Sequence, residues 1–146
     1  MVAHALDGQA AAADAGWGVG VHRSNIVTDE LWMDPKLEGF NLIVSHKDQV
    51  LQLPSDAVLL AGSEFCPYGM FRIGEHILTF QGHPEFCKDY SKTLMEYRED
   101  ILGVDTFETG MASLASDTGG EGRRFARWIV NFVGDVTRDT RETREE

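Results

Sequence analysis

The residues best suited to chemistry in this chain are a histidine and a glutamate, His83 and Glu85, which flank a proline. A carboxylate in that position can accept a hydrogen bond from one imidazole nitrogen and leave the other nitrogen free to act as a general base. This pair corresponds to the histidine and acid of a nucleophile–His–Glu triad. The tripeptide also occurs by chance, so its surroundings decide how it is interpreted.

Two cysteines, Cys66 and Cys87, are the nucleophiles to consider beside His83. Cys66 precedes a proline and has no glycine neighbour, which does not suit a sharp turn from a strand into a helix. Cys87 lies at the start of a predicted helix, a position that favours a thiolate, but the imidazole would have to fold back on its own loop. The sequence favours a buried, reduced thiol beside aromatic side chains for both residues.

Metal and phosphate chemistry have weaker support. A zinc set of His83 and Cys87 with Cys66 or His76 lacks the paired spacing of zinc ligands. The alternating glycines of residues 16–20 fit a strand better than a phosphate loop, because no helix or lysine follows them. We therefore expect no metal and no cofactor, and we expect His22 and His76 at the surface or a strand edge.

The elements around His83 predict where it lies. An apolar run over residues 76–80 leads directly to it, and Pro84 ends that strand because proline cannot donate to a ladder. In open α/β sheets, ligands bind at this carboxyl end of the strands. The other expected elements are a helix-compatible stretch at 1–15, strands at 16–22, 41–45 and 57–61, a strand at 70–73 that forms a hairpin with 76–80 through a two-residue turn, a helix at 89–102, a loop or short irregular helix at 104–120, and a helix at 122–133.

The composition limits the class of protein. The chain has 146 residues, with 13 Lys and Arg against 24 Asp and Glu, so its formal net charge is −11. A chain this acidic is a poor match for nucleic acid or an anionic membrane. No run approaches the roughly 20 apolar residues of a membrane helix, and no signal peptide is recognisable. We expect one cytoplasmic domain.

Four motifs, one of which contains His83 and Glu85, have a characteristic order and spacing. They are Ser45-His46-Lys47-Asp48-Gln49-Val50, Leu53-Pro54, Met70-Phe71-Arg72-Ile73-Gly74 and Gln81-Gly82-His83-Pro84-Glu85. Over roughly residues 1–102 this set resembles the class I glutamine amidotransferase family, especially its stand-alone members of the guanosine-monophosphate-synthetase-like type and the plant γ-glutamyl peptidases.

The resemblance implies an α/β fold, with a flavodoxin-like sheet and flanking helices. It also implies hydrolysis of the γ-amide of glutamine, or of a related γ-glutamyl bond, through a cysteine thioester. His83 would shuttle the proton and Glu85 would orient His83. Ser45 and His46 would lie beside the bound γ-glutamyl group and help to position its α-amino and α-carboxylate ends.

The chain departs from the family at its start. The family's nucleophile lies in a Gly-x-Cys-x-Gly turn, and residues 1–8 match the helix that follows this turn, but the turn itself is absent. The resemblance therefore implies a partial domain over residues 1–133 with its N-terminal half missing, followed by a charged tail over 134–146. We predict no activity from this chain alone.

Two alternatives remain for a chain without a nucleophile. It could be an inactive remnant or partner-binding module whose exposed sheet edge pairs with a second copy or with a chain that supplies the missing half. It could also begin at an internal methionine of a longer gene.

Overall fold

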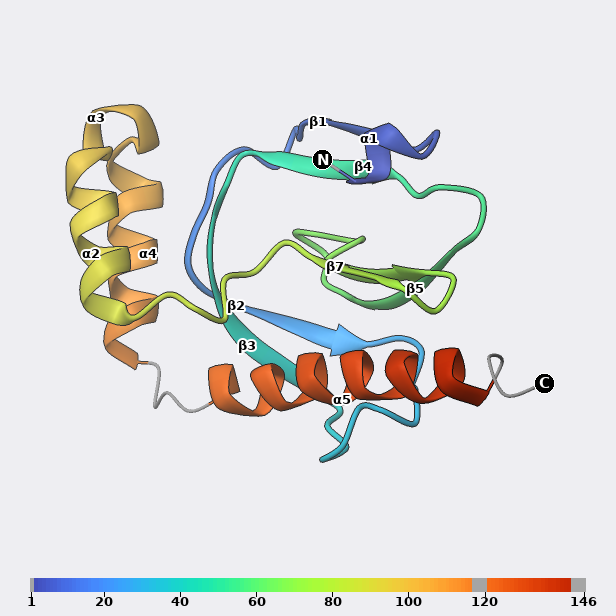
Figure 1. Ribbon diagram of the computed structural model, residues 1–146. Coiled ribbons are helices and arrows are strands. Elements are labelled where there is room, and N and C mark those ends of the chain that lie inside the picture. Colours follow the sequence, from blue (N-terminus) through green and yellow to red (C-terminus); the bar gives the residue numbers. More distant parts are fainter. Residues whose placement is uncertain (1, 117–120, 143–146) are drawn as a thin grey trace.

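The computed structural model describes the backbone of residues 2–116 and 121–142 and the side chains of 2–116 and 121–135 (Figure 1). The strands are β1 (Gln9–Ala12), β2 (Gly18–Ile26), β3 (Gly39–His46), β4 (Asp48–Gln52), β5 (Ala57–Gly62), β6 (Met70–Ile73) and β7 (Ile77–Phe80). The helices are α1 (Val2–Ala5), α2 (Lys88–Tyr97), α3 (Glu99–Leu102), α4 (Val104–Ser116) and α5 (Glu121–Glu142).

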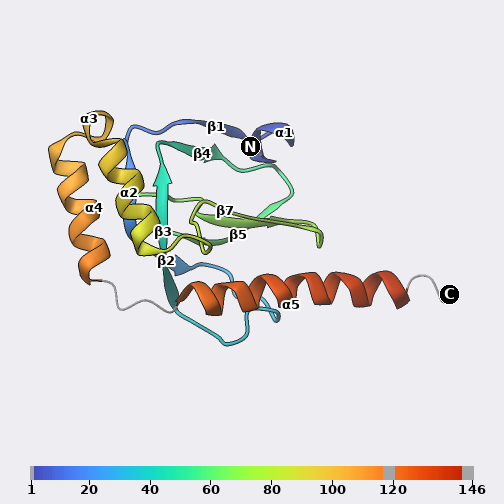
Figure 2. The ribbon, with the colours of Figure 1, turned by 60° about the vertical axis from the view of Figure 1, so that its left-hand side comes forward.

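The larger sheet has five strands in the order β3-β2-β5-β6-β7, and a smaller sheet pairs β1 with β4. Every strand pairing in the described part of the chain is antiparallel. Helices α2, α3 and α4 stand together at one end of the sheet, and α5 runs along its other side (Figures 1 and 2). The predicted α/β fold, a sheet with flanking helices, is confirmed.

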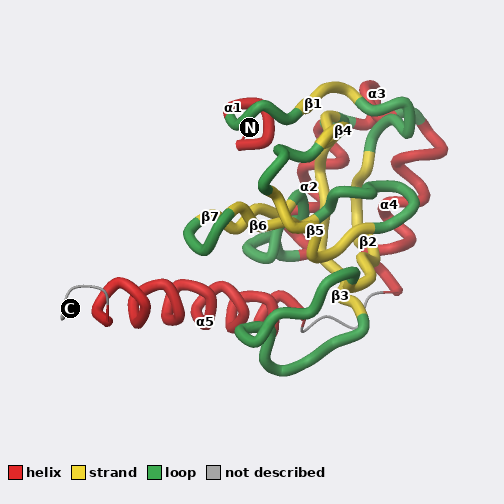
Figure 3. The backbone as a smooth tube through the Cα atoms, turned by 90° about the vertical axis from the view of Figure 1, so that its right-hand side faces the viewer, coloured by secondary structure: helices red, strands yellow, loops and turns green. Residues whose placement is uncertain are grey.

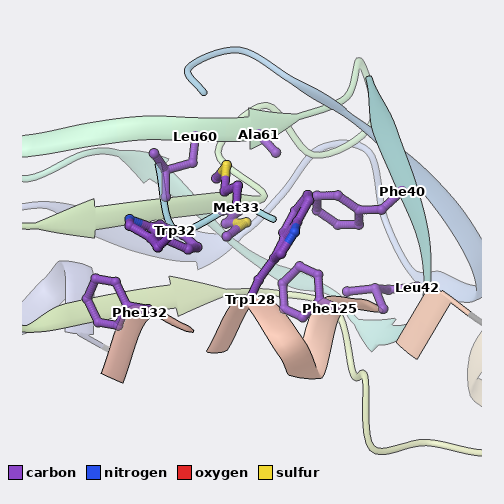
Figure 4. Close-up of a cluster of buried hydrophobic side chains, with 10 residues drawn as sticks. Trp32, Met33, Phe40, Leu42, Leu60, Ala61, Phe125, Trp128 and Phe132 are labelled. Carbon is purple, nitrogen blue, oxygen red and sulfur yellow. The ribbon is translucent and has the colours of Figure 1, made fainter. Parts of the chain in front are cut away.

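Strands β2 and β3 carry core residues on both faces, because successive side chains of a strand point to opposite sides. On one face, Phe40 and Leu42 of β3 pack against three aromatic residues of α5 (Figure 4). These are Phe125, Trp128 and Phe132. Successive members of this set are three and four residues apart, so they lie on one face of the helix and form an apolar stripe. This stripe explains why α5 lies along the sheet.

The other face of β2 and β3 is covered by α2, α3 and α4. Val19 and Ile43 share one buried cluster with a residue from each of these helices, and these residues are Met95, Leu102 and Leu114. Residues 104–116 form the regular helix α4, in place of the loop or short irregular helix predicted over 104–120. The small residues that suggested a loop are needed for close packing: a Cβ atom on Gly110 would lie 2.8 Å from Val19 Cγ2. Residues 117–120 lie outside the described residues.

The predicted N-terminal helix is wrong beyond its first turn. Helix α1 ends at Ala5, the backbone of Asp7 is left-handed with φ 64°, and the Gly8 N–H donates to the Ala3 carbonyl at 2.8 Å. The alanines of β1 then pair with β4, which the sequence analysis did not identify. Pairing within the fold has overridden the helix propensity of alanine.

Three boundaries also differ from the predictions. The helix expected over 89–102 is divided at Arg98, whose φ and ψ of −111° and 13° are not helical. The hairpin turn has three residues, because Ile73 pairs with Ile77. The predicted tail from Gly134 continues α5 as far as Glu142, and residues 143–146 lie outside the described residues.

Among the described residues, no helix combines the length and apolar character needed to cross a membrane.

Candidate active site

The loop that carries His83 is fixed against β3. The backbone N–H of His83 donates to the carbonyl oxygen of Ile43 at 2.7 Å. Gly82 permits this approach, because a Cβ atom there would lie 2.8 Å from the Leu42 side chain. The N–H of Phe86 then donates to the His83 carbonyl at 3.2 Å and closes the following turn. The backbone on both sides of the imidazole is therefore held in place.

The predicted contact between His83 and Glu85 is confirmed. His83 Nδ1 and Glu85 Oε1 are 2.8 Å apart, and the His83 ring stacks on Phe86 with centroids 4.0 Å apart and planes 9° apart. The His83 side chain is 32% exposed, so it is not sealed in the core. With Nδ1 directed at the carboxylate, Nε2 is the ring nitrogen left for a reacting group.

The electrostatics keep Glu85 ionised. Partial burial acts to raise the pKa of Glu85, but the hydrogen bond and positive charge of His83, with a backbone hydrogen bond, outweigh it and lower this pKa. An ionised Glu85 can accept the Nδ1–H of His83 at neutral pH, which is the role expected of the acid in a triad.

The structure places Ser45 and His46 on opposite faces of β3, as neighbours in a strand must be. Ser45 Oγ accepts a hydrogen bond from Arg98 at 3.2 Å, and the Arg98 guanidinium lies over the Trp17 ring at 5.9 Å. His46 faces the other way, toward Phe65, with ring centroids 6.2 Å apart. The two predicted binding residues are thus not brought together by their side chains.

His46 is within electrostatic reach of His83. Burial first, and then the nearby His22 and His83, lower the pKa of His46 to about 4, against a backbone hydrogen bond at Asp48 that raises it. Its Nδ1 is buried and, within the described residues, has no hydrogen-bond partner. His46 is therefore a neutral group near the candidate site at physiological pH.

The two cysteines have different surroundings, and both are free thiols. Cys66 is buried as predicted, Gln81 donates to its sulfur at 2.9 Å, and burial raises the pKa of the thiol. The prediction of burial is wrong for Cys87, which is exposed at the N-cap of α2. Its aromatic neighbour Phe86 packs inward, whereas Cys87 lies where the chain turns outward to begin the helix.

A pocket opens beside His83, between β3 and the first turns of α2 and α5. His83 and Cys87 both line it, with Glu121 and Arg123 from α5. The Glu121 carboxylate accepts the backbone N–H of Asn41, which ties α5 to β3 at the pocket wall. The imidazole and the exposed thiol therefore border the same pocket.

In the described part of the chain, no group of three or more His, Cys, Asp or Glu side chains is arranged to hold a metal ion.

Sequence reasoning missed two residues near the site. Arg98 was not singled out within the helix expected over 89–102, but the helix breaks there and its guanidinium donates to Ser45. His22 was expected at the surface or a strand edge, but it is half-buried against Phe65, with ring centroids 4.8 Å apart. No local pattern in the sequence identifies it, because its burial depends on Phe65, which lies in a distant segment.

No protein-family model matches the chain. It is 42% identical over 77 residues to gamma-glutamyl peptidase 3 of Arabidopsis thaliana, which covers 53% of this chain and 30% of the relative. It is 30% identical over 122 residues to gamma-glutamyl peptidase 2 of the same plant, covering 81% of this chain and 48% of the relative. The chain thus spans at most about half the length of these relatives.

The fold is shared with a glutamine amidotransferase of Thermotoga maritima. The TM-score is 0.67 at 19% sequence identity, and the match covers 91% of this chain and 58% of the other. The sequence comparisons and the fold agree with the resemblance carried by the motifs around His83. The chain is therefore a homologue of the gamma-glutamyl peptidases and of glutamine amidotransferase-like proteins.

Proposed function

We propose that this chain provides the proton-transfer part of a hydrolase centre that cleaves the γ-amide of glutamine or a related γ-glutamyl bond. The observation that carries the proposal is the 2.8 Å contact between His83 Nδ1 and Glu85 Oε1 at the edge of an open pocket. The similarity to gamma-glutamyl peptidases supports the class of bond.

In the proposed reaction, His83 Nε2 takes the proton of a cysteine thiol as the sulfur attacks the γ-carbonyl carbon. The same proton passes to the leaving nitrogen when the C–N bond breaks. Water then hydrolyses the γ-glutamyl thioester with His83 as the base, which releases the γ-glutamyl acid and returns the thiol. Glu85 remains ionised throughout and stabilises the imidazolium. Neither cysteine of this chain lies in a Gly-x-Cys-x-Gly turn, so the proposal takes the attacking sulfur to come from outside the chain.

The proposed roles of Ser45 and His46 now differ. His46 lies within electrostatic reach of His83 but does not line the pocket that His83 borders, so we propose that it acts on a γ-glutamyl ligand only indirectly. Ser45 would act by orienting Arg98, whose guanidinium suits the α-carboxylate of such a ligand.

A second candidate function is a catalytically inactive module that binds a partner. The observation that favours it is the outer edge of β7, which pairs with β6 on one side and with no strand on the other among the described residues. An uncovered sheet edge is a template for another chain.

Glutamate release tests the hydrolase proposal. We expect the chain alone to release no glutamate from glutamine or from a γ-glutamyl dipeptide, at the detection limit of a coupled assay. Release that is lost in both His83→Ala and Cys87→Ser would identify Cys87 as the nucleophile and refute the missing-nucleophile part. Release that survives His83→Ala would refute the role of His83. The exposed histidine of the hairpin supplies the matched control, His76→Ala.

A further inference from the structure

One residue of the motif around His83 has no part in the proposed reaction. This residue, Gln81, directly follows β7 and precedes His83 by two positions. Its backbone N–H donates to the Gly69 carbonyl at 2.9 Å, and its side-chain Nε2 donates to Cys66 Sγ, also at 2.9 Å. Gln81 is therefore bound twice to the connection between β5 and β6, which are the strands that precede β7 in the sheet order (Figure 3).

The connection between β5 and β6 is a firm anchor for the Gln81 side chain. The Ser63 N–H donates to the Cys66 carbonyl, and the Cys66 N–H donates to Ser63 Oγ, both at 3.0 Å. A Cβ atom on Gly62 would overlap the Pro67 carbonyl oxygen, so the connection folds tightly back on the end of β5. Cys66 is buried, and burial raises the pKa of its thiol, so the sulfur that accepts from Gln81 stays uncharged at physiological pH.

The backbone of His83 meets β3 through a single hydrogen bond. Donation from the His83 N–H to the Ile43 carbonyl forms an isolated bridge, outside the ladders of the named strands. Such a bond opens more readily than one inside a ladder, because no neighbouring bonds have to open with it. An anchor at Gln81, two residues earlier, limits how far the chain can move along β3. By contrast, the contact between His83 and Glu85 lies within one turn and does not need this anchor.

We propose that Gln81 is a positioning residue, whose side-chain hydrogen bond to Cys66 fixes where the chain leaves β7 and thereby holds the backbone of His83 against β3. Glu85 sets the orientation of the imidazole, and Gln81 sets its place relative to the sheet. The inference rests on the proposed function, because the place of the imidazole matters for catalysis only if the ring moves a proton.

Amide hydrogen exchange of His83 tests this role. Gln81→Met keeps the length and the main-chain N–H of the residue but removes the side-chain donor, and Cys66→Ala removes the acceptor. In both variants we expect the His83 amide to exchange at least ~10-fold faster relative to the amides of the β2–β3 ladder, which report unfolding of the whole domain. Combining the two substitutions should add little, since each removes the same hydrogen bond.

Two matched controls separate positioning from general stability. Cys66→Ser retains a hydrogen-bond acceptor for Gln81, so the His83 amide should stay close to its wild-type rate. Thr79→Val removes a different side-chain donor of β7, which bonds to the Phe71 carbonyl at 3.2 Å. This variant should leave the exchange of the His83 amide unchanged relative to the β2–β3 ladder.

The ring tautomer of His83, read from its nitrogen-15 chemical shifts, separates this inference from the proposed function. In Gln81→Met we expect the wild-type tautomer, because Glu85 is still beside the ring. A wild-type ring with no preference for a protonated Nδ1 would count against the proposed function, whereas a faster His83 amide in Gln81→Met and Cys66→Ala would still support the positioning role.

Three results would overturn the inference. The first is a His83 amide that is no faster than the ladder amides in Gln81→Met or in Cys66→Ala. The second is a Cys66→Ser variant whose His83 amide is as fast as in Cys66→Ala. The third is loss of the folded state in Gln81→Met and Cys66→Ala, which would show that the pair only stabilises the fold.

Discussion

Replacing Trp128 by alanine should lower the free energy of unfolding by about 3–5 kcal/mol, the range for deleting a large buried aromatic side chain. Trp128 is 1% exposed and packs against Phe40 and Phe125, with ring centroids 5.9 and 5.8 Å away (Figure 4). Its Nε1 also donates to the Pro35 carbonyl at 3.0 Å, a hydrogen bond that alanine cannot make. The substitution therefore removes the contacts of α5 with Phe40 of β3 and with the Pro35 carbonyl.

Urea denaturation measures this loss, and Val130→Ala is the matched control. Val130 lies on the same helix but is 69% exposed, so its truncation should change the free energy of unfolding by no more than about 0.5 kcal/mol. Equal effects of Trp128→Ala and Val130→Ala would show that α5 is not packed as described.

Acidification should destabilise the protein through His46. Burial, followed by the nearby His22 and His83, lowers the pKa of His46 from 6.5 to about 4. Between these values the unfolded chain binds a proton that the folded chain does not, so stability is full above about pH 6.5 and falls as the pH approaches 4. The contribution from this group is at most about 3 kcal/mol, because one pKa unit corresponds to about 1.4 kcal/mol.

The free energy of unfolding as a function of pH checks this prediction. In His46→Gln, which cannot titrate, we expect a shallower decline between pH 6.5 and 4 than in the wild type. The control is His76→Gln, at an exposed histidine of the hairpin turn, which should follow the wild-type curve. A decline in His46→Gln as steep as that of the wild type would contradict the assignment.

The sequence predicted the elements whose pattern is local. Apolar runs at β3 and β5, the β6–β7 hairpin and the stripe of α5 all follow from periodicity. The alanines of β1 were predicted to be helical because only their pairing with β4 makes them a strand. Similarly, the small, polar, Gly-flanked segment of α4 was predicted as a loop or short irregular helix, because the packing that makes it a helix, such as Gly110 against Val19, involves a distant strand.

The candidate site divides in the same way. Contact between His83 and Glu85 could be predicted, because two residues on one turn are close whatever the rest of the chain does. The burial of His22 and His46 against Phe65 could not, since it depends on how distant segments meet. The exposure of Cys87 was missed because aromatic neighbours in sequence do not fix where a helix begins.

The ring-nitrogen chemical shifts of His83, measured by NMR on nitrogen-15-labelled protein at a pH where the ring is neutral, test the central claim most directly. The Nδ1–H of His83 donating to Glu85 should make the Nδ1-protonated tautomer predominant and leave the lone pair on Nε2. In Glu85→Ala this preference should be lost. A wild-type ring that is protonated mainly on Nε2, or a tautomer ratio unchanged in Glu85→Ala, would contradict the assignment of His83 as a carboxylate-oriented proton carrier.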